Sequence, residues 1–149
     1  MKNEFWVTRD KDNDQGEYAT LWMVEPHLDR NGYFGIDGSG DWENLVYESI
    51  KILKLVGISN LRKGNKLRYK FVAEKTNDEP KKSNNIFWIA REKGENNYVR
   101  ILLGTEIPDK KDYYSNGLGV CVKVARAVGI RLRKGQAAKF RITAERVDA

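Results

Sequence analysis

The chain has 149 residues, of which 40% are hydrophobic, 11% aromatic and 32% charged, and its net charge of +6 comes from 27 Lys and Arg against 21 Asp and Glu. This composition suits a folded domain with a packed core and excludes a wholly disordered chain. The chain has no apolar run near the ~18 residues of a membrane-spanning helix, no second cysteine for an intramolecular disulfide and no secretory signal at its acidic start, so we expect a cytoplasmic protein.

A β-hairpin is predicted at the start of the chain. Residues 5–9 (FWVTR) alternate between two faces, which is the period of a strand. Residues 10–17 are rich in Asp and Asn and form a turn, and a second strand is expected over 18–24. A shorter strand at 33–36 is predicted in the loop that follows.

A helix is predicted over residues 41–57. Asp41 is expected as the N-cap residue and Gly57 as the C-cap residue, and the apolar residues between them form one stripe at helical spacing. The stripe consists of Trp42, Leu45, Val46, Ile50, Leu53 and Val56. The last strand of this half covers 67–75, where alternate residues from Leu67 to Ala73 face inward.

The second half repeats these elements in the same order. Strands are expected over 87–91 and 98–103, and a closing strand is expected over 138–144. A helix is predicted between them, but Gly117 and Gly119 destabilise it and alternate valines also fit a strand, so the strand is kept as the alternative. The helical stripe consists of Tyr114, Leu118, Cys121, Val122, Ala125 and Val128, and the alternating valines are Val120, Val122 and Val124.

Four matched blocks indicate that the chain is a duplication. FWVTRD at 5–10 returns as FWIARE at 87–92, an offset of 82. VGI returns at an offset of 72, and LRKG and the Ala-Glu pair of the last strand return at an offset of 71, all in the same order. Self-similarity of this kind is the signature of a repeat architecture. We predict repeats at 1–75 and 86–149, joined by a polar linker at 76–85.

Each repeat is expected to be a ββ(β)αβ unit. The fold class is therefore α+β, with a mainly antiparallel sheet and one helix per repeat. A unit of this size has a marginal core on its own. The two repeats are expected to share one core and to be related by a pseudo-twofold axis.

The positive charge is unevenly distributed along the chain. The net charge is −5 over residues 1–41, +5 over 42–75, zero over 76–112 and +6 over 113–149. The excess lies in the LRKG turn and on the outward face of the last strand of each repeat. These basic residues are Arg62, Lys63, Lys66, Arg68 and Lys70 in the first repeat and Arg131, Arg133, Lys134, Lys139 and Arg141 in the second.

Paired basic strands and turns predict a small, non-enzymatic binding protein for single-stranded DNA or RNA, or for another polyanion. Lys and Arg pair with phosphates, while bases stack on exposed rings at ~1–3 kcal/mol per base. The candidate rings are Trp6 and Trp88, each next to a phenylalanine in its strand. A competing interpretation is that the basic faces are only solvated sheet surfaces.

A second functional hypothesis is a protein-interaction module or inhibitor of the kind encoded by phages and mobile elements. Its small size and the separation of acidic from basic segments suit docking on a protein partner. The acidic residues of segment 10–41 then matter as much as the basic ones.

Other motifs are interpreted as structural, so no enzyme, metal or cofactor is predicted. The chain has one histidine and one cysteine, and no motif positions a nucleophile. Asp10, Asp12 and Asp14 resemble the start of a calcium loop, but Gln15 and Leu21 replace its glycine and its last carboxylate. Glu25, His27 and Asp29 alternate around Pro26, and residues 35–40 form a glycine-rich turn without a phosphate-loop pattern.

Overall fold

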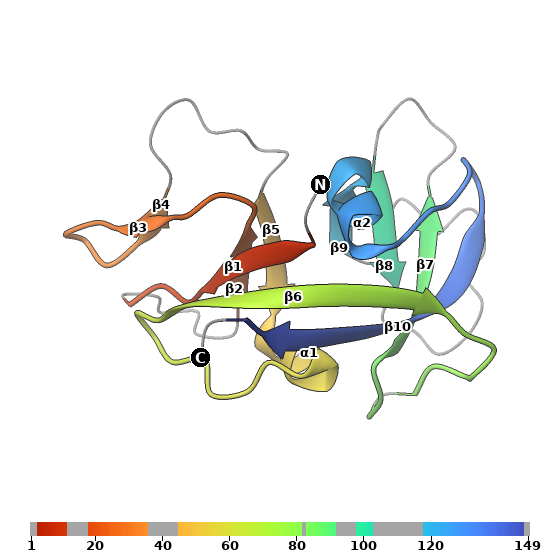
Figure 1. Ribbon diagram of the computed structural model, residues 1–149, viewed down its shortest axis with the longest axis horizontal. Helices are drawn as coiled ribbons and strands as arrows, with labels where there is room; N and C mark the ends of the chain where they lie inside the picture. The colour runs from red at the N-terminus through yellow and green to blue at the C-terminus, as the bar shows by residue number, and fades with distance from the viewer. Residues whose placement is uncertain are drawn as a thin grey trace. The chain divides into compact units, whose positions relative to one another are not determined.

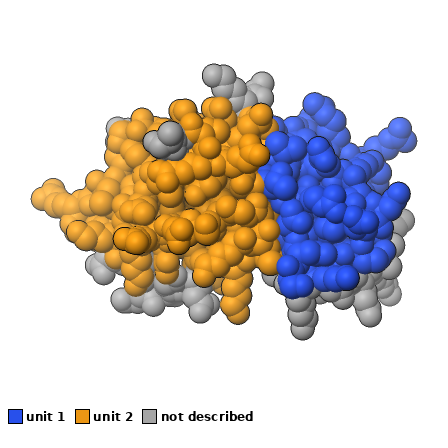
Figure 2. Space-filling model, turned by 60° about the horizontal axis from the view of Figure 1, so that its bottom comes forward, with its two compact units in different colours: residues 1, 72–143 blue, residues 2–71, 144–149 orange. Residues whose placement is uncertain are grey.

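The computed structural model describes residues 3–11, 18–35, 45–81, 83–91, 98–102 and 118–147 (Figure 1). The fold is α+β, with antiparallel strands and two helices in the described part. Two compact units are distinguished in Figure 2: unit 1 is Val72–Thr143 with Met1, and unit 2 is Lys2–Phe71 with Ala144–Ala149. Neither of the described helices has the length and apolarity to cross a membrane.

Unit 2 is built on an antiparallel sheet with the strand order β5-β2-β1-β6. Its strands are β1 (Glu4–Thr8), β2 (Tyr18–Trp22), β5 (Leu45–Ser49) and β6 (Lys66–Lys75), of which the residues to Phe71 belong to this unit. Helix α1 (Ile50–Val56) follows β5, and a separate hairpin pairs β3 (His27–Leu28) with β4 (Phe34–Gly35).

Unit 1 has the corresponding order β10-β7-β8-β9, also antiparallel. Its strands are β7 (Ile86–Arg91), β8 (Tyr98–Leu102), β9 (Leu118–Cys121) and β10 (Ala137–Arg146), of which the residues to Thr143 belong to this unit. Helix α2 (Val122–Val128) follows β9. The end of β6, from Val72, also belongs to unit 1, where Thr76 N–H donates to Lys139 O at 3.1 Å.

The apolar alternation predicted for the first and last strands is confirmed. In unit 2, Phe5 is 1% exposed, and its ring meets that of Phe71 edge to face at 5.5 Å between centroids. In unit 1, Phe140 is 1% exposed and Ile89 is fully buried. Packing of these alternate side chains fixes which face of each strand is left for the polar residues.

The prediction of one long helix over 41–57 is wrong. Residues 45–49 are strand β5, whose register on β2 pairs Tyr18 with Ser49 and Trp22 with Leu45. Spacing of apolar residues alone did not distinguish the two structures, and pairing with β2 selected the strand for a segment that contains Val and Tyr. The helix begins only at Ile50, so Asp41, which lies outside the described residues, is not its N-cap.

Both alternatives kept for the second half apply, each to a different segment. Residues 118–121 form strand β9, and the helix covers only Val122–Val128. The expected elements therefore lacked β5 and β3, and β9 was expected only as the alternative to a longer helix. The short strand expected at 33–36 is present as β4, and Tyr114 lies outside the described residues.

Gly57 ends α1 as predicted, and Gly129 ends α2 in the same way. Their φ angles are 115° and 107°, a region that favours glycine. A Cβ on Gly57 would lie 2.9 Å from Ala144 O, and one on Gly129 would lie 2.8 Å from Ala73 O. Each glycine is thus required both by its backbone angle and by the close approach of a strand.

Contacts at the strand ends recur at the sequence offsets of the repeats. In unit 2, Asn3 Nδ2 donates to Phe71 O at 2.8 Å, and Phe71 N–H donates to Asn3 O at 2.9 Å. In unit 1, Asn85 Nδ2 donates to Ile142 O at 2.8 Å, and Ile142 N–H donates to Asn85 O at 3.0 Å. We call residues at offsets of 82 in the first strands and 71 in the last strands equivalent.

Candidate anion-binding site

The basic turn of unit 2 is fixed by an arginine at the end of β1. Arg9 Nη1 donates to Leu61 O at 3.2 Å, and Gly64 N–H donates to Arg9 O at 2.7 Å. The φ of Gly64 is 83°, so the turn closes at a residue that tolerates this angle. Because Arg9 binds the backbone of the turn, the side chains of Arg62 and Lys63 are not needed to hold it and remain exposed to solvent.

The equivalent turn of unit 1 has the same construction. Arg91 Nη1 donates to Leu132 O at 2.9 Å, Gly135 N–H donates to Arg91 O at 2.9 Å, and Gly135 has a φ of 78°. Gln136 Oε1 also accepts from Arg133 N–H at 2.9 Å. The cationic side chains of this turn are therefore carried by a backbone that is hydrogen-bonded at both ends.

A hollow of about 720 Å³ lies against this turn in unit 1. Five of the eight described residues that line it are cationic, and none of the eight carries a carboxylate. The lining consists of Lys75, Arg126, Arg131, Leu132, Arg133, Lys134, Gly135 and Gln136. Within the described residues, none of the five cations takes part in an ion pair. We call this the basic hollow.

Three of the five cations in the basic hollow were predicted from the sequence as anion-binding residues, and two were not. Arg131, Arg133 and Lys134 were expected as a cluster, and the structure brings them together. Lys75 was assigned to the first repeat, and only the extension of β6 into unit 1 places it here. Arg126 lies in the last turn of α2, and its positive charge was the one feature of the sequence that could have indicated it as an anion-binding residue.

A second hollow of about 460 Å³ adjoins the basic hollow, because Lys75 lines both. We call it the tryptophan hollow, since it contains the predicted ring Trp88 together with the predicted cation Lys139. The Lys139 Nζ lies 5.7 Å from the centre of the Trp88 ring. The other described residues of its lining are Thr76, Asn77, Ala137 and Ala138.

Two predicted cations of β10 are paired with acidic residues of the segment 76–80. Lys139 Nζ donates to Glu79 Oε1 at 2.7 Å and to Asn77 O at 3.0 Å. Arg141 Nη2 donates to Asp78 Oδ2 at 2.5 Å. The exposed carboxylates therefore already neutralise part of the basic face of this strand, which weakens it as an anion site.

In unit 2 the predicted ring Trp6 is covered by two predicted cations. Lys66 Nζ lies 5.2 Å and Arg68 Cζ lies 5.6 Å from the ring centre, and Arg68 faces Trp6 in the strand register. Lys66 Nζ also donates to Glu25 Oε1 at 2.8 Å and to Pro26 O at 3.3 Å. The hydrogen bond from Lys66, and then its charge, lowers the pKa of Glu25.

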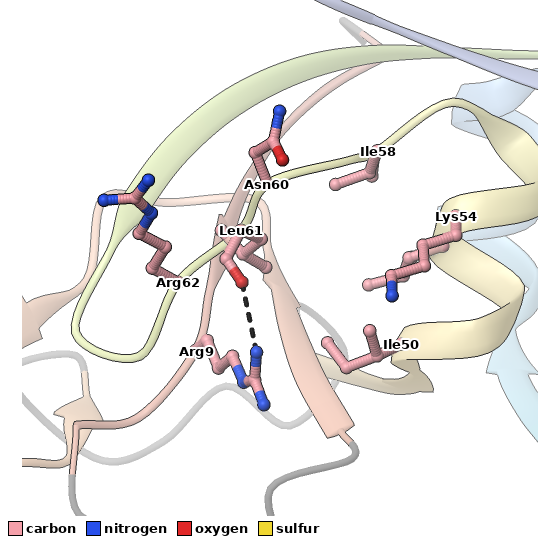
Figure 3. A pocket seen from close by; sticks show the side chains of 8 residues that line it. Arg9, Ile50, Lys54, Ile58, Asn60, Leu61 and Arg62 are labelled. Carbon is pink, nitrogen blue, oxygen red and sulfur yellow. Dashed lines mark hydrogen bonds between the residues drawn. The ribbon is translucent and has the colours of Figure 1, made fainter.

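The hollow beside the turn of unit 2 is smaller and half apolar. It has a volume of about 260 Å³ and lies between α1 and residues 58–62 (Figure 3). Arg62 is the only member of the predicted basic set in its lining, which consists of Arg9, Ile50, Leu53, Lys54, Ile58, Asn60, Leu61 and Arg62. Lys63, Lys70 and Arg141 line none of the three hollows.

The motifs interpreted as structural have structural partners where they are described. Asp10 Oδ1 accepts from Phe34 N–H at 2.9 Å, and Asp29 Oδ1 accepts from Asn31 and Tyr33 N–H at 2.8 and 3.0 Å. Within the described ranges, no group of three or more His, Cys, Asp or Glu side chains is placed to hold a metal ion. Asp12, Asp14 and residues 36–40 lie outside the described residues.

Comparisons with known proteins assign no family to this chain: no family model matches it, and neither does a curated protein or a solved structure.

Proposed function

We propose that this is a non-enzymatic binding protein for single-stranded nucleic acid or another polyanion, and that the basic hollow of unit 1 is its main phosphate site. The observation that carries the proposal is the convergence of five cations on one hollow whose described lining has no carboxylate. Like charges held close together repel one another, and a bound phosphate relieves that repulsion.

The side chains of the basic hollow suit a chain of phosphates better than one enclosed phosphate. Arg126, Arg131, Arg133 and Lys134 are all exposed. Guanidinium groups pair with phosphate oxygens through two parallel hydrogen bonds, and exposed cations reach successive phosphates of a flexible strand. An extended polyanion therefore uses more of these contacts than a small anion does.

We also propose that the two units arose by duplication and carry a pseudo-twofold relation, with repeats at 1–75 and 86–149 and a linker at 76–85. The support is that the same contacts recur at the offsets found in the sequence. Asn3 and Asn85 bind the last strands alike, and Arg9 and Arg91 bind the basic turns alike. On this proposal the basic turn is inherited by both units, and unit 1 carries the further cation Arg131 where unit 2 has the uncharged Ser59 and Asn60.

A second candidate function is docking on a protein partner through unit 2. It is favoured by apolar side chains at the surface of that unit, since Val24, Leu28 and Tyr33 are 45%, 43% and 47% exposed. Such side chains contribute to protein interfaces but are also common singly on surfaces. This function predicts binding that depends on unit 2 and responds weakly to salt.

The test measures binding of a fluorescent single-stranded oligonucleotide by anisotropy over a range of salt concentrations. If five phosphates are neutralised, the logarithm of the affinity should fall with the logarithm of salt at a slope of about −3.5. Arg133→Gln/Lys134→Gln should reduce the slope by about 1.4, and the matched control Arg62→Gln/Lys63→Gln in unit 2 should leave it nearly unchanged.

Absence of binding at about 50 mM salt contradicts the proposed function. Equal losses in the two double variants contradict the assignment of the phosphate site to unit 1.

A further inference from the structure

The tryptophan hollow differs from the surface around the equivalent ring of unit 2 at one decisive position. In unit 2 the register places Lys66 opposite Thr8, beside Trp6, and the lysine lies over the ring. In unit 1 the equivalent position is Ala137, opposite Ala90. Among the described side chains, one cation, Lys139, therefore lies over Trp88, whereas Lys66 and Arg68 both lie over Trp6.

Loss of that second cation opens space beside the ring. Ala137 and the next residue, Ala138, replace Lys66 and Leu67 of unit 2, and both alanines line the hollow with Trp88. The volume of about 460 Å³ is within the range of small-molecule sites. Trp88 and Ala137 also pack against the fully buried Ala90, and this packing holds the Trp88 side chain in position.

The exposed part of the Trp88 side chain is carbon surface. Its Nε1 atom is buried, although the residue as a whole is only half-buried. A ring presented in this way offers a face or edge for stacking and no hydrogen-bond donor to a ligand. Stacking without donors tolerates any base, because every base has a π face.

Lys75 connects the two hollows, so one ligand can occupy both. We propose that the tryptophan hollow is a base site, in which one unpaired nucleobase stacks on Trp88 while the adjoining phosphates lie on Lys75 and the basic hollow. This inference rests on the proposed function and deepens it. It names single strands with accessible bases as the ligand, in preference to duplexes and to polyanions without bases.

The decisive experiment compares an oligothymidylate with an abasic oligomer of the same length and charge, using the wild-type chain. The base site predicts that the oligothymidylate binds roughly 5- to 150-fold more tightly, which corresponds to stacking of one base. Equal affinities for the two oligomers overturn the base site while the proposed function stands. Failure of both oligomers to bind at low salt overturns both.

Two variants test whether the preference for the oligothymidylate over the abasic oligomer depends on Trp88. Trp88→Leu should remove the preference for the oligothymidylate and leave the affinity for the abasic oligomer unchanged, whereas the matched control Trp6→Leu should keep the preference. Circular dichroism checks that each variant is folded.

Ala137→Lys gives a second test that leaves the ring in place. It introduces the lysine found at the equivalent position of unit 2, and it should reduce the preference for the oligothymidylate although it adds a positive charge. An equal rise in affinity for both oligomers overturns the base site, because charge alone then explains binding.

Discussion

Unit 1 and unit 2 share a framework but differ in the surface that it leaves open. Both hold an LRKG turn with an arginine side chain and end their helix at a left-handed glycine. Between VGI and LRKG, however, unit 2 has the uncharged Ser59 and Asn60 where unit 1 has Arg131, and beside its tryptophan unit 2 has Lys66 in place of Ala137. A few side-chain differences thus distinguish the basic and tryptophan hollows of unit 1 from the surface of unit 2, where Lys66 and Arg68 lie over Trp6.

The interiors of the two units differ as well. In unit 2, Trp22 Nε1 donates to Thr8 Oγ1 at 2.8 Å, and both residues are buried. In unit 1 the equivalent of Thr8 is Ala90, and the strand register pairs Trp88 with Leu102 where it pairs Trp6 with Trp22 in unit 2. Unit 2 therefore contains a buried hydrogen bond between Trp22 and Thr8. The residues at the matching strand positions of unit 1, Leu102 and Ala90, have no polar side-chain atoms with which to form it.

The largest expected effect tests whether both units depend on the same helix ending. Gly57→Ala and Gly129→Ala should each lower the free energy of unfolding by roughly 2–4 kcal/mol, because a Cβ is strained at positive φ and meets a carbonyl oxygen. Urea denaturation measures the loss. Gly35→Ala is the control, since no described atom outside residue 35 and its two chain neighbours lies within 4 Å of the new Cβ. A loss in only one unit would break the structural equivalence.

A smaller effect is expected for the buried pair found only in unit 2. Thr8→Val should lower the free energy of unfolding by about 1–3 kcal/mol, because it leaves the Trp22 N–H buried without its partner. A double-mutant cycle with Trp22→Phe should give a coupling of about 1 kcal/mol. A coupling of zero would show that the hydrogen bond does not distinguish the units energetically.

The smallest effect concerns the ion pair of Glu25 with Lys66 in unit 2. A carboxyl whose pKa is lowered from 4.5 in the folded state stabilises that state when ionised, so its contribution is present above this value and is lost as the pH falls through the lowered pKa. Glu25→Gln should therefore lower the melting temperature slightly near neutral pH. The difference from the wild type should disappear in acid, and a difference that persists there would argue against the ion pair as its cause.

The sequence predicted the strands whose faces differ in polarity. The alternation around Phe5, Phe87 and Phe140 was sufficient for β1, β7 and β10, because the burial of alternate residues is written in the local pattern. It was insufficient for β5, because Leu45 and Val46 also fit the helical stripe that continues into α1 at Ile50. Local spacing does not include the partner strand, and pairing with β2 decided the structure.

The candidate site shows the same division. The sequence by itself determined the cationic turn, because LRKG and its left-handed glycine are local features. It also predicted Lys139 on a basic strand and Trp88 as a candidate ring, and the structure brings the two together. Only the tertiary structure brought Lys75 and Arg126 to Arg131, where they line one hollow of unit 1. The physical reason is that side chains from separate elements line the hollow. Whether these side chains come close together depends on the strand register and on the continuation of β6 into unit 1, and local sequence patterns specify neither.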